Sequence, residues 1–260
     1  MGTDVPDPNP GAARRRPSID CKTFLREHTG KLSDHYEVIG DLGEGGFGDV
    51  WLARELVRVA TPHERAGRSV AVKRVRKPNP EAGLDEEGAD SEEALESFRT
   101  EVELMKSLDH PNICRLLQVF EDAKNIYLVM ERMEGGELFD RIVSWGSFGE
   151  EDAAHVMAQV ASALAYCHHR GIVHRDIKPA NLLLATPDLA QARLLLADFG
   201  VAELFEEHGT MSSIVRGSVA YMAPEVFLNT VSPRSDVWAL GIVTYELFCG
   251  VRPFYADNAM

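Results

Sequence analysis

The chain has 260 residues, 45% apolar and 26% charged, so it can bury the core of one bilobal domain or of two small domains. Its formal net charge of −14 argues against a general binder of nucleic acids or of anionic membranes, because such proteins need positive surfaces. The four cysteines show no metal-ligand spacing, and there is no secretory signal and no long apolar run. We expect reduced thiols in an intracellular protein, cytoplasmic with the nucleus as a further compartment.

Residues 1–30 are rich in Pro, Gly, Ala and charge and show no apolar period, so we expect a disordered tail. The chain opens Met-Gly, but Pro6 stands where a myristoylation motif needs Ser or Thr. The sequence therefore predicts no lipid and no membrane anchor.

Residues 36–42 and 50–53 are predicted to be strands. Between them lies a run of the form G-x-G-x-x-G-x-V, Gly43-Glu44-Gly45-Gly46-Phe47-Gly48-Asp49-Val50. Glycines let a turn approach phosphate groups closely and offer main-chain N–H groups. Dinucleotide-binding folds use a similar spacing, but their loop opens a helix. Because β-type residues follow here, we favour a phosphate-binding hairpin.

Residues 70–72 form a short apolar strand that ends at Lys73. A single lysine at a strand end is more often an ordinary surface residue than a ligand of phosphate groups. The functional interpretation of Lys73 therefore needs a carboxylate partner elsewhere in the chain. Residues 91–108 carry apolar residues with a helical period, and that helix offers two candidate partners for Lys73, Glu101 and Glu103. The acidic residues 85–96 predict a solvated insertion, since the glycine and ligand spacing of an EF-hand is missing.

Residues 126–130 are predicted to form a buried strand. Farther along come His174-Arg175-Asp176-Ile177-Lys178-Pro179-Ala180-Asn181 and then Asp198-Phe199-Gly200. Asp176 can orient and deprotonate a hydroxyl, and Lys178 can neutralise a phosphoryl group in transfer. Asn181 and Asp198 can hold magnesium. Either short motif alone could arise by chance, so the interpretation depends on the order and spacing of all the parts.

In this order the motifs, with Gly217 to Glu225 and Asp236 to Gly241 downstream, resemble those of protein kinases over residues 36–254. The resemblance implies an α+β, bilobal fold with a β-rich N-lobe at 36–131 and a mainly helical, partial C-lobe at 132–260. ATP and Mg²⁺ would bind in the cleft between the lobes.

The resemblance also assigns residues. It favours Glu101 over Glu103 as the partner of Lys73. The catalytic residues would be Asp176, Lys178 and Asn181, and the metal ligands Asn181 and Asp198. The nucleotide site would comprise Leu42, Gly43, Glu44, Gly45, Gly46, Phe47, Gly48, Asp49, Val50, Ala71, Lys73, Glu101, Met130, Glu131, Met133, Glu137 and Leu183.

Lys178, two residues after Asp176, and Ser218 are typical of kinases that modify Ser and Thr in protein substrates. Residues 108–113, 135–140 and 172–176 resemble the calcium/calmodulin-dependent group. The entry segment 30–36 narrows the resemblance to calcium-dependent protein kinases of plants and protists. Ala180 stands where that group usually has Glu, so we expect no strict preference for Arg near the acceptor. Ser212 and Ser213 are phosphorylation candidates that activity should not require.

The chain stops at Met260, where kinases continue through further helices. We therefore expect a C-lobe lacking its last helices and no EF-hand in this chain. The helix expected at residues 235–249 is apolar on nearly all sides, so part of it should be uncovered. Two functions stay open: a Mg-ATP-dependent serine/threonine kinase, or a catalytically silent fragment that binds nucleotide or a partner.

Overall fold

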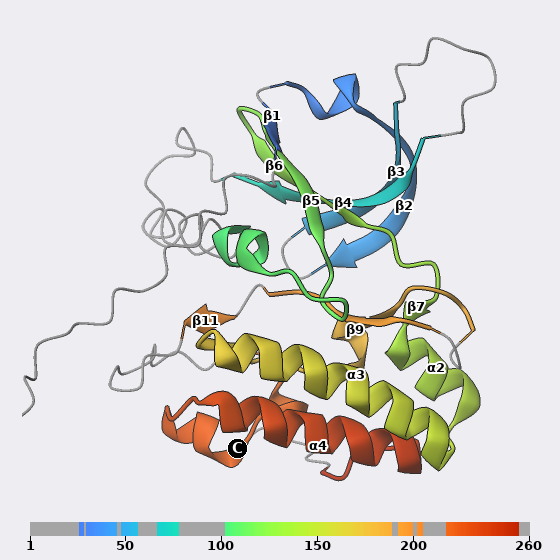
Figure 1. Cartoon of the computed structure of the whole chain (residues 1–260), viewed down its shortest axis with the longest axis vertical. Helices are drawn as coiled ribbons and strands as arrows, with labels where there is room; N and C mark the ends of the chain where they lie inside the picture. Colours follow the sequence, from blue (N-terminus) through green and yellow to red (C-terminus); the bar gives the residue numbers. More distant parts are fainter. Residues whose placement is uncertain are drawn as a thin grey trace, which may run out of the picture.

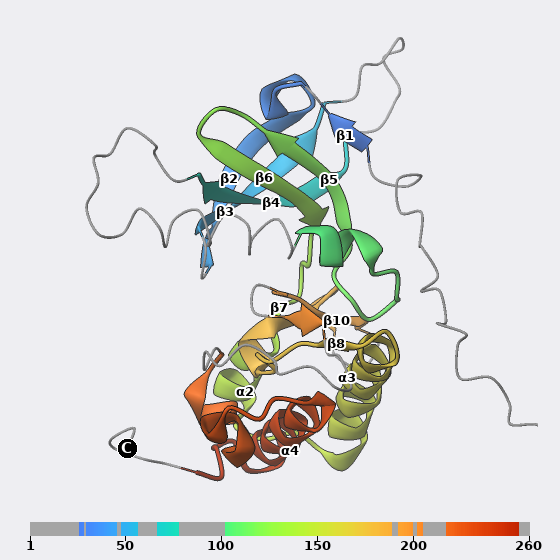
Figure 2. The ribbon, with the colours of Figure 1, turned by 90° about the vertical axis from the view of Figure 1, so that its left-hand side faces the viewer.

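The computed structural model covers the whole chain and describes residues 26–28, 30–45, 48–56, 67–77, 102–188, 192–199, 202–204 and 217–254. Its described part has two lobes, a twisted sheet above and a mainly helical body below (Figures 1 and 2). This is the bilobal α+β arrangement expected from the sequence.

The N-lobe sheet has the order β1-β5-β6-β4-β3-β2. Its strands are β1 (Arg26–His28), β2 (Tyr36–Gly45), β3 (Gly48–Glu55), β4 (Ser69–Arg76), β5 (Leu116–Glu121) and β6 (Asn125–Glu131), with the short 3-10 helix η2 (Leu32–Asp34) before β2. Central residues such as Val70, Val72 and Leu128 are buried, as expected for β-branched and aliphatic residues in the middle of a sheet. Residues 102–107 are helical and lie beside the sheet.

Strand β1 lies within the segment predicted to be disordered. It pairs in parallel with β5, with Arg26 opposite Gln118 and His28 opposite Phe120. The prediction of disorder is wrong for these residues, because pairing with an edge strand uses main-chain groups and needs no apolar pattern. Residues 1–25 lie outside the described part of the chain.

The C-lobe opens with β7 (Gly136–Glu137) and α2 (Leu138–Trp145), followed by α3 (Glu150–His169). Short elements follow: β8 (Ile172–Val173), η3 (Pro179–Asn181), β9 (Leu182–Leu184), β10 (Leu194–Leu196), β11 (Glu203–Leu204), η4 (Val219–Tyr221) and η5 (Pro224–Leu228). The last helix is α4 (Pro233–Cys249). Strands β10, β9 and β7 form one small sheet, and β11 pairs with β8. These short strands place the loops of the site at the top of the lobe, facing the sheet.

Helix α3 has acidic residues in its first turn and His168 and His169 in its last turn, which complement the helix dipole. It buries a stripe at helical spacing, from Ala153 and Val156 to Val160. Helix α4 lies alongside α3 (Figure 1) and begins two residues before the predicted start. There Ser232 caps the helix with Pro233 in its first turn, and Gly250 ends it in the left-handed conformation.

Helix α4 buries Ala239, Ile242, Val243 and Leu247 against the lobe. Its other face leaves large apolar side chains exposed in the described structure: Val237, Trp238, Tyr245 and Phe248. Trp238 stacks on Phe254 with ring centroids 6.0 Å apart.

Within the described residues, no helix combines the length and the apolar character needed to cross a membrane.

Candidate active site

An open cleft of about 330 Å³ lies between the two lobes. Strands β2, β3, β4 and β6 supply its upper wall, and β7, β9 and the segments around Asn181 and Asp198 supply its lower wall. The residues predicted for the nucleotide and metal site that line this cleft are Leu42, Gly43, Val50, Ala71, Lys73, Met130, Glu131, Met133, Glu137, Asn181, Leu183 and Asp198. Residues from both lobes thus meet at one cavity.

Some predicted residues are placed elsewhere or are not described. Asp49 forms an ion pair with Arg74 and is not among the residues that line the cleft. Glu44 and Gly45 belong to the end of β2, and Gly48 opens β3. Gly46, Phe47 and Glu101 lie outside the described residues.

The hairpin between β2 and β3 requires glycine at position 48. Gly48 has φ 148°, and a Cβ there would lie 2.0 Å from the main-chain oxygen of Arg74 on the neighbouring strand. Only glycine permits so close an approach of two main chains. The last predicted glycine of the loop thus brings the hairpin against β4, the strand that carries Lys73.

Lys73 projects from β4 toward the lower wall of the cleft. Its Nζ lies 3.2 Å from Oδ1 of Asp198, and the residue is only 7% exposed. Glu103, the alternative partner considered for Lys73, is exposed and lies 2.7 Å from Lys106 instead. A lysine and a carboxylate from opposite lobes therefore meet at the inner end of the cleft.

Asp176 sits in a loop between β8 and η3, held by donors on several sides. Its Oδ2 accepts from Lys178 Nζ at 2.7 Å and from Asn181 Nδ2 at 2.9 Å, and its Oδ1 accepts from the Ser218 amide at 2.8 Å. Lys178 also donates to Ser218 Oγ at 2.9 Å. The predicted catalytic residues are thus joined in one hydrogen-bonded cluster.

Burial by itself would raise the pKa of the Asp176 carboxyl. Hydrogen bonds from Lys178 and Ser218, together with the charge of Lys178, outweigh that effect and hold the pKa below its ordinary value. The carboxylate is therefore ionised at neutral pH and can accept a hydrogen bond from a hydroxyl.

The loop is anchored to the lobe beneath it. The amides of His174 and Arg175 donate to the buried carboxylate of Asp236 at 2.9 and 2.8 Å, and His168 Nε2 lies 2.7 Å from the same group. The His174 ring packs edge-on against Phe199, and its Nε2 lies 3.1 Å from the Ala197 oxygen. Burial lowers the pKa of His174, so the ring is neutral.

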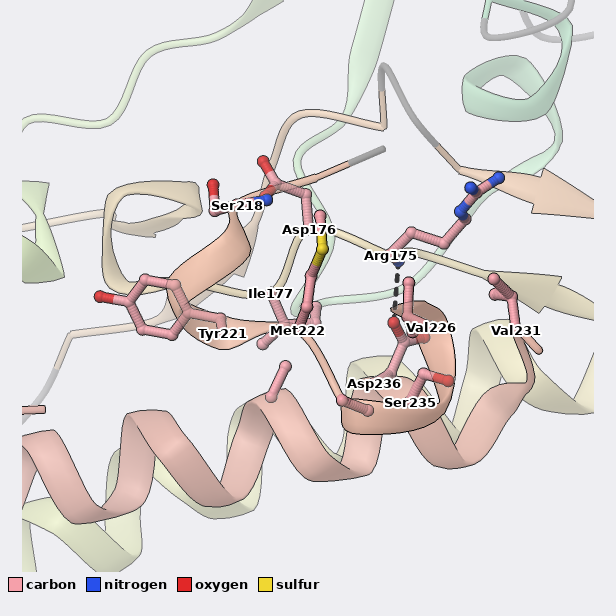
Figure 3. A pocket seen from close by; sticks show the side chains of 12 residues that line it. Arg175, Asp176, Ile177, Ser218, Tyr221, Met222, Val226, Val231, Ser235 and Asp236 are labelled. Atoms are coloured by element: carbon pink, nitrogen blue, oxygen red, sulfur yellow. Dashed lines mark hydrogen bonds between the residues drawn. The ribbon is translucent and has the colours of Figure 1, made fainter. Parts of the chain in front are cut away.

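A second, much smaller cavity of about 20 Å³ lies behind Asp176, between the 217–226 segment and α4. Figure 3 shows Arg175 bonded through its main chain to Asp236 while its guanidinium points away from that carboxylate. Tyr221, also labelled there, donates its hydroxyl to the buried Glu246 at 2.8 Å. Burial and the neighbouring Glu246 raise the pKa of Tyr221. The segment that carries Ser218 is therefore fixed onto α4 by a neutral phenol.

Sequence reasoning missed part of the cleft: Met105, Cys114, Leu128, Gly136, Ala180 and Ala197 also line it. Met105 and Leu128 were recognised only as apolar positions of a helix and a strand. Burial and then the charge of Glu131 raise the pKa of the Cys114 thiol to about 12. Strand alternation could have suggested Leu128, whereas Met105 lies in a helix and Cys114 and Ala197 lie outside regular structure, where no apolar period marks them.

Asn181 and Asp198 are the residues that could hold a cation. The Asn181 amide nitrogen donates to the Asp176 main-chain oxygen at 2.7 Å, which leaves its amide oxygen as the atom to face a metal. In the described part of the chain, no three His, Cys, Asp or Glu residues cluster as a metal site. An amide oxygen and one carboxylate suit Mg²⁺, which takes its remaining ligands from phosphate and water.

Residues 36–260 match the model of the protein kinase domain. Calcium-dependent protein kinase 8 of Oryza sativa subsp. japonica is 39% identical over 250 residues, 95% of this chain and 42% of the relative. Calcium/calmodulin-dependent protein kinase type 1B of Homo sapiens is 38% identical over 236 residues, 90% of this chain and 62% of the relative. CDPK-related kinase 7 of Arabidopsis thaliana is 36% identical over 244 residues, 92% of this chain and 40% of the relative. The chain thus spans about half the length of these curated relatives.

Proposed function

Because the chain belongs to the protein kinase family, we propose that it transfers the γ-phosphate of ATP to Ser and Thr hydroxyls of protein substrates. Relatives named as calcium-dependent and calcium/calmodulin-dependent kinases support this choice. For the whole protein we propose calcium-responsive control and a cytoplasmic location.

The observation that carries the proposal is the cluster around Asp176. Its carboxylate is ionised, oriented by three donors and 90% buried, so it can align the acceptor hydroxyl and take its proton. Lys178 lies within hydrogen-bond distance of both Asp176 and Ser218, where a cation can balance charge on a phosphoryl group in transfer. Through these bonds Ser218 connects the segment that begins at Gly217 to Asp176, the proposed base.

The cleft residues suit a magnesium nucleotide. Bound there, Mg-ATP would supply the activated phosphoryl group. Ala71, Val50 and Leu183 would enclose the base, Lys73 would contact the phosphates, and Asn181 with Asp198 would hold the metal. Burial and then Asp140 raise the pKa of Glu137, which lines the same cleft and would contact the ribose or a basic substrate side chain.

A silent binding fragment is the second candidate, favoured by the exposed apolar face of α4. Val237, Trp238 and Phe248 are exposed on this face in the described structure, and exposed apolar surfaces commonly bind other proteins.

Comparing phosphoryl transfer by the wild-type chain with an Asp198→Ala variant separates the two. We expect incorporation of phosphate from Mg-ATP into a Ser/Thr peptide library by the wild type, and a loss of at least about a hundredfold in the variant. Equal activity in the two proteins, both shown to be folded by circular dichroism, would defeat the kinase proposal. Chelation of magnesium with EDTA should abolish the wild-type activity in the same assay.

A further inference from the structure

We propose that Arg193 is a positioning residue for the nucleotide. Its guanidinium binds the Glu131 carboxylate and so holds the main chain of the segment that would bind the adenine. The segment concerned is residues 131–135, which join the two lobes and are called the hinge below. This inference rests on the proposed function, because it concerns how the same cleft binds ATP.

Glu131 is the first hinge residue, and both oxygens of its carboxylate are hydrogen-bonded to residues that do not line the cleft. Its Oε2 accepts from Arg193 Nη2 at 2.8 Å, and its Oε1 accepts from the Arg115 amide at 3.1 Å. The Glu131 amide donates to the Arg115 oxygen at 3.3 Å. The side chain and the amide of Glu131 are thus bonded to Arg115 and Arg193, which do not line the cleft, while Glu131 itself does.

Arg193 belongs to the other lobe. It directly precedes β10, and its main-chain oxygen accepts from the Ala185 amide at 2.9 Å. The same hairpin holds the far end of the hinge, since the Glu134 and Gly135 amides donate to Ala185 and Leu184 at 3.2 and 2.9 Å. One hairpin of the C-lobe therefore fixes both ends of the hinge, by a side chain at the first and by main-chain bonds at the second.

The burial of the pair makes this contact matter more than an ordinary surface ion pair. The Glu131 side chain is 11% exposed and the Arg193 side chain 47% exposed. A carboxylate so far removed from water is costly without a cation nearby, whereas the arginine keeps half of its hydration. Removing Arg193 should therefore favour a shift of Glu131 toward solvent.

Such a shift would reach the adenine pocket through the sheet. Glu131 pairs with Val70, and its neighbour Met130 pairs with Ala71. Ala71 and Met130 both line the cleft beside Glu131. A displaced first hinge residue would move the main-chain groups proposed to bind adenine relative to this wall. It would leave the cluster around Asp176, on the opposite side of the cleft, in place.

The test measures the Kd of Mg-ADP by isothermal calorimetry and the KM and kcat for ATP on the full chain. We expect Arg193→Ala to raise Kd and KM roughly two- to fivefold with kcat nearly unchanged. Arg193→Lys, which retains the charge, should recover most of the affinity. Glu131→Gln keeps an acceptor for the Arg115 amide but loses the ion pair, so its nucleotide affinity should resemble that of Arg193→Ala. The double variant should bind Mg-ADP about as tightly as the single variant with the lower affinity.

Lys77→Ala is the control, because it removes an ion pair whose carboxylate, that of Glu121, is 52% exposed and lies at the far end of the sheet. It should leave nucleotide affinity within error of the wild type. An unchanged Kd in Arg193→Ala, or fully additive effects of Arg193→Ala and Glu131→Gln, would overturn the inference while an active wild type keeps the kinase proposal. A wild-type chain that neither binds Mg-ADP nor transfers phosphate would overturn both.

Discussion

The ammonium group of Lys178 lies 2.7 Å from Oδ2 of Asp176. The same nitrogen reaches Ser218 at 2.9 Å, so one cation links the proposed base to the segment that would receive the substrate. The arrangement makes the base and the charge-balancing group interdependent.

Lys178→Met should lower kcat by about 10²–10³-fold, because a cation next to the transferring group is lost while the nucleotide pocket is kept. KM for ATP should change much less. Steady-state kinetics with a Ser/Thr peptide checks this, with Lys124→Met, an exposed lysine of the N-lobe, as control. A kcat within a fewfold of the wild type would contradict the role assigned to Lys178.

Gly48→Ala should destabilise the protein by about 1–3 kcal/mol and raise KM for ATP, since its Cβ would collide with the Arg74 main chain. Urea denaturation and ATP kinetics provide the readouts. Gly40→Ala on the same hairpin is the control, because a Cβ there would meet only Leu52 side-chain atoms, from 3.8 Å. Equal effects of the two substitutions would argue against the close approach at Gly48.

Tyr221→Phe should cost about 1–3 kcal/mol of unfolding free energy, because it takes a donor from the buried carboxylate of Glu246. Tyr127→Phe is the matched control. Its hydroxyl also donates to a carboxylate, but that of Asp122 is exposed and keeps the amides of Lys124 and Asn125 as donors, each at 2.7 Å. Chemical denaturation of both variants should show a clearly larger loss for Tyr221→Phe, and the reverse order would refute the argument.

The stability of the wild type should fall as the pH drops below about 6.5, in part through His174. Its folded-state pKa is lowered by burial, so the unfolded chain takes up the proton first and gains free energy relative to the folded chain. The contribution of one such histidine can reach about 1.4 kcal/mol per pH unit. The difference in unfolding free energy between the wild type and His174→Leu should therefore shrink from pH 7 to pH 5. A difference that stays constant over this range would show that His174 is not kept neutral by the fold.

Much of the site could be predicted from the sequence, because phosphoryl transfer requires particular residues in a fixed order. The motifs around Asp176 and Asp198 and the glycines of the hairpin name chemical groups directly, and strands and helices near them follow from apolar periods. Met105 and Cys114 could not be assigned to the cleft in this way, since an apolar side chain or a thiol looks the same in a core and in a pocket wall.

The sequence by itself determined the family, the bilobal fold and the identity of the chemical groups, because these depend on residue type and spacing along the chain. Only the tertiary structure decided which of those groups meet. Lys73 contacts Asp198, 125 residues away in the sequence, and Arg193 forms an ion pair with Glu131, 62 residues away. The strand Arg26–His28 could also be recognised only from its pairing with β5 in the structure. Contacts of this kind depend on how separate elements pack, and neither local propensity nor periodicity records which side chain a distant one will face.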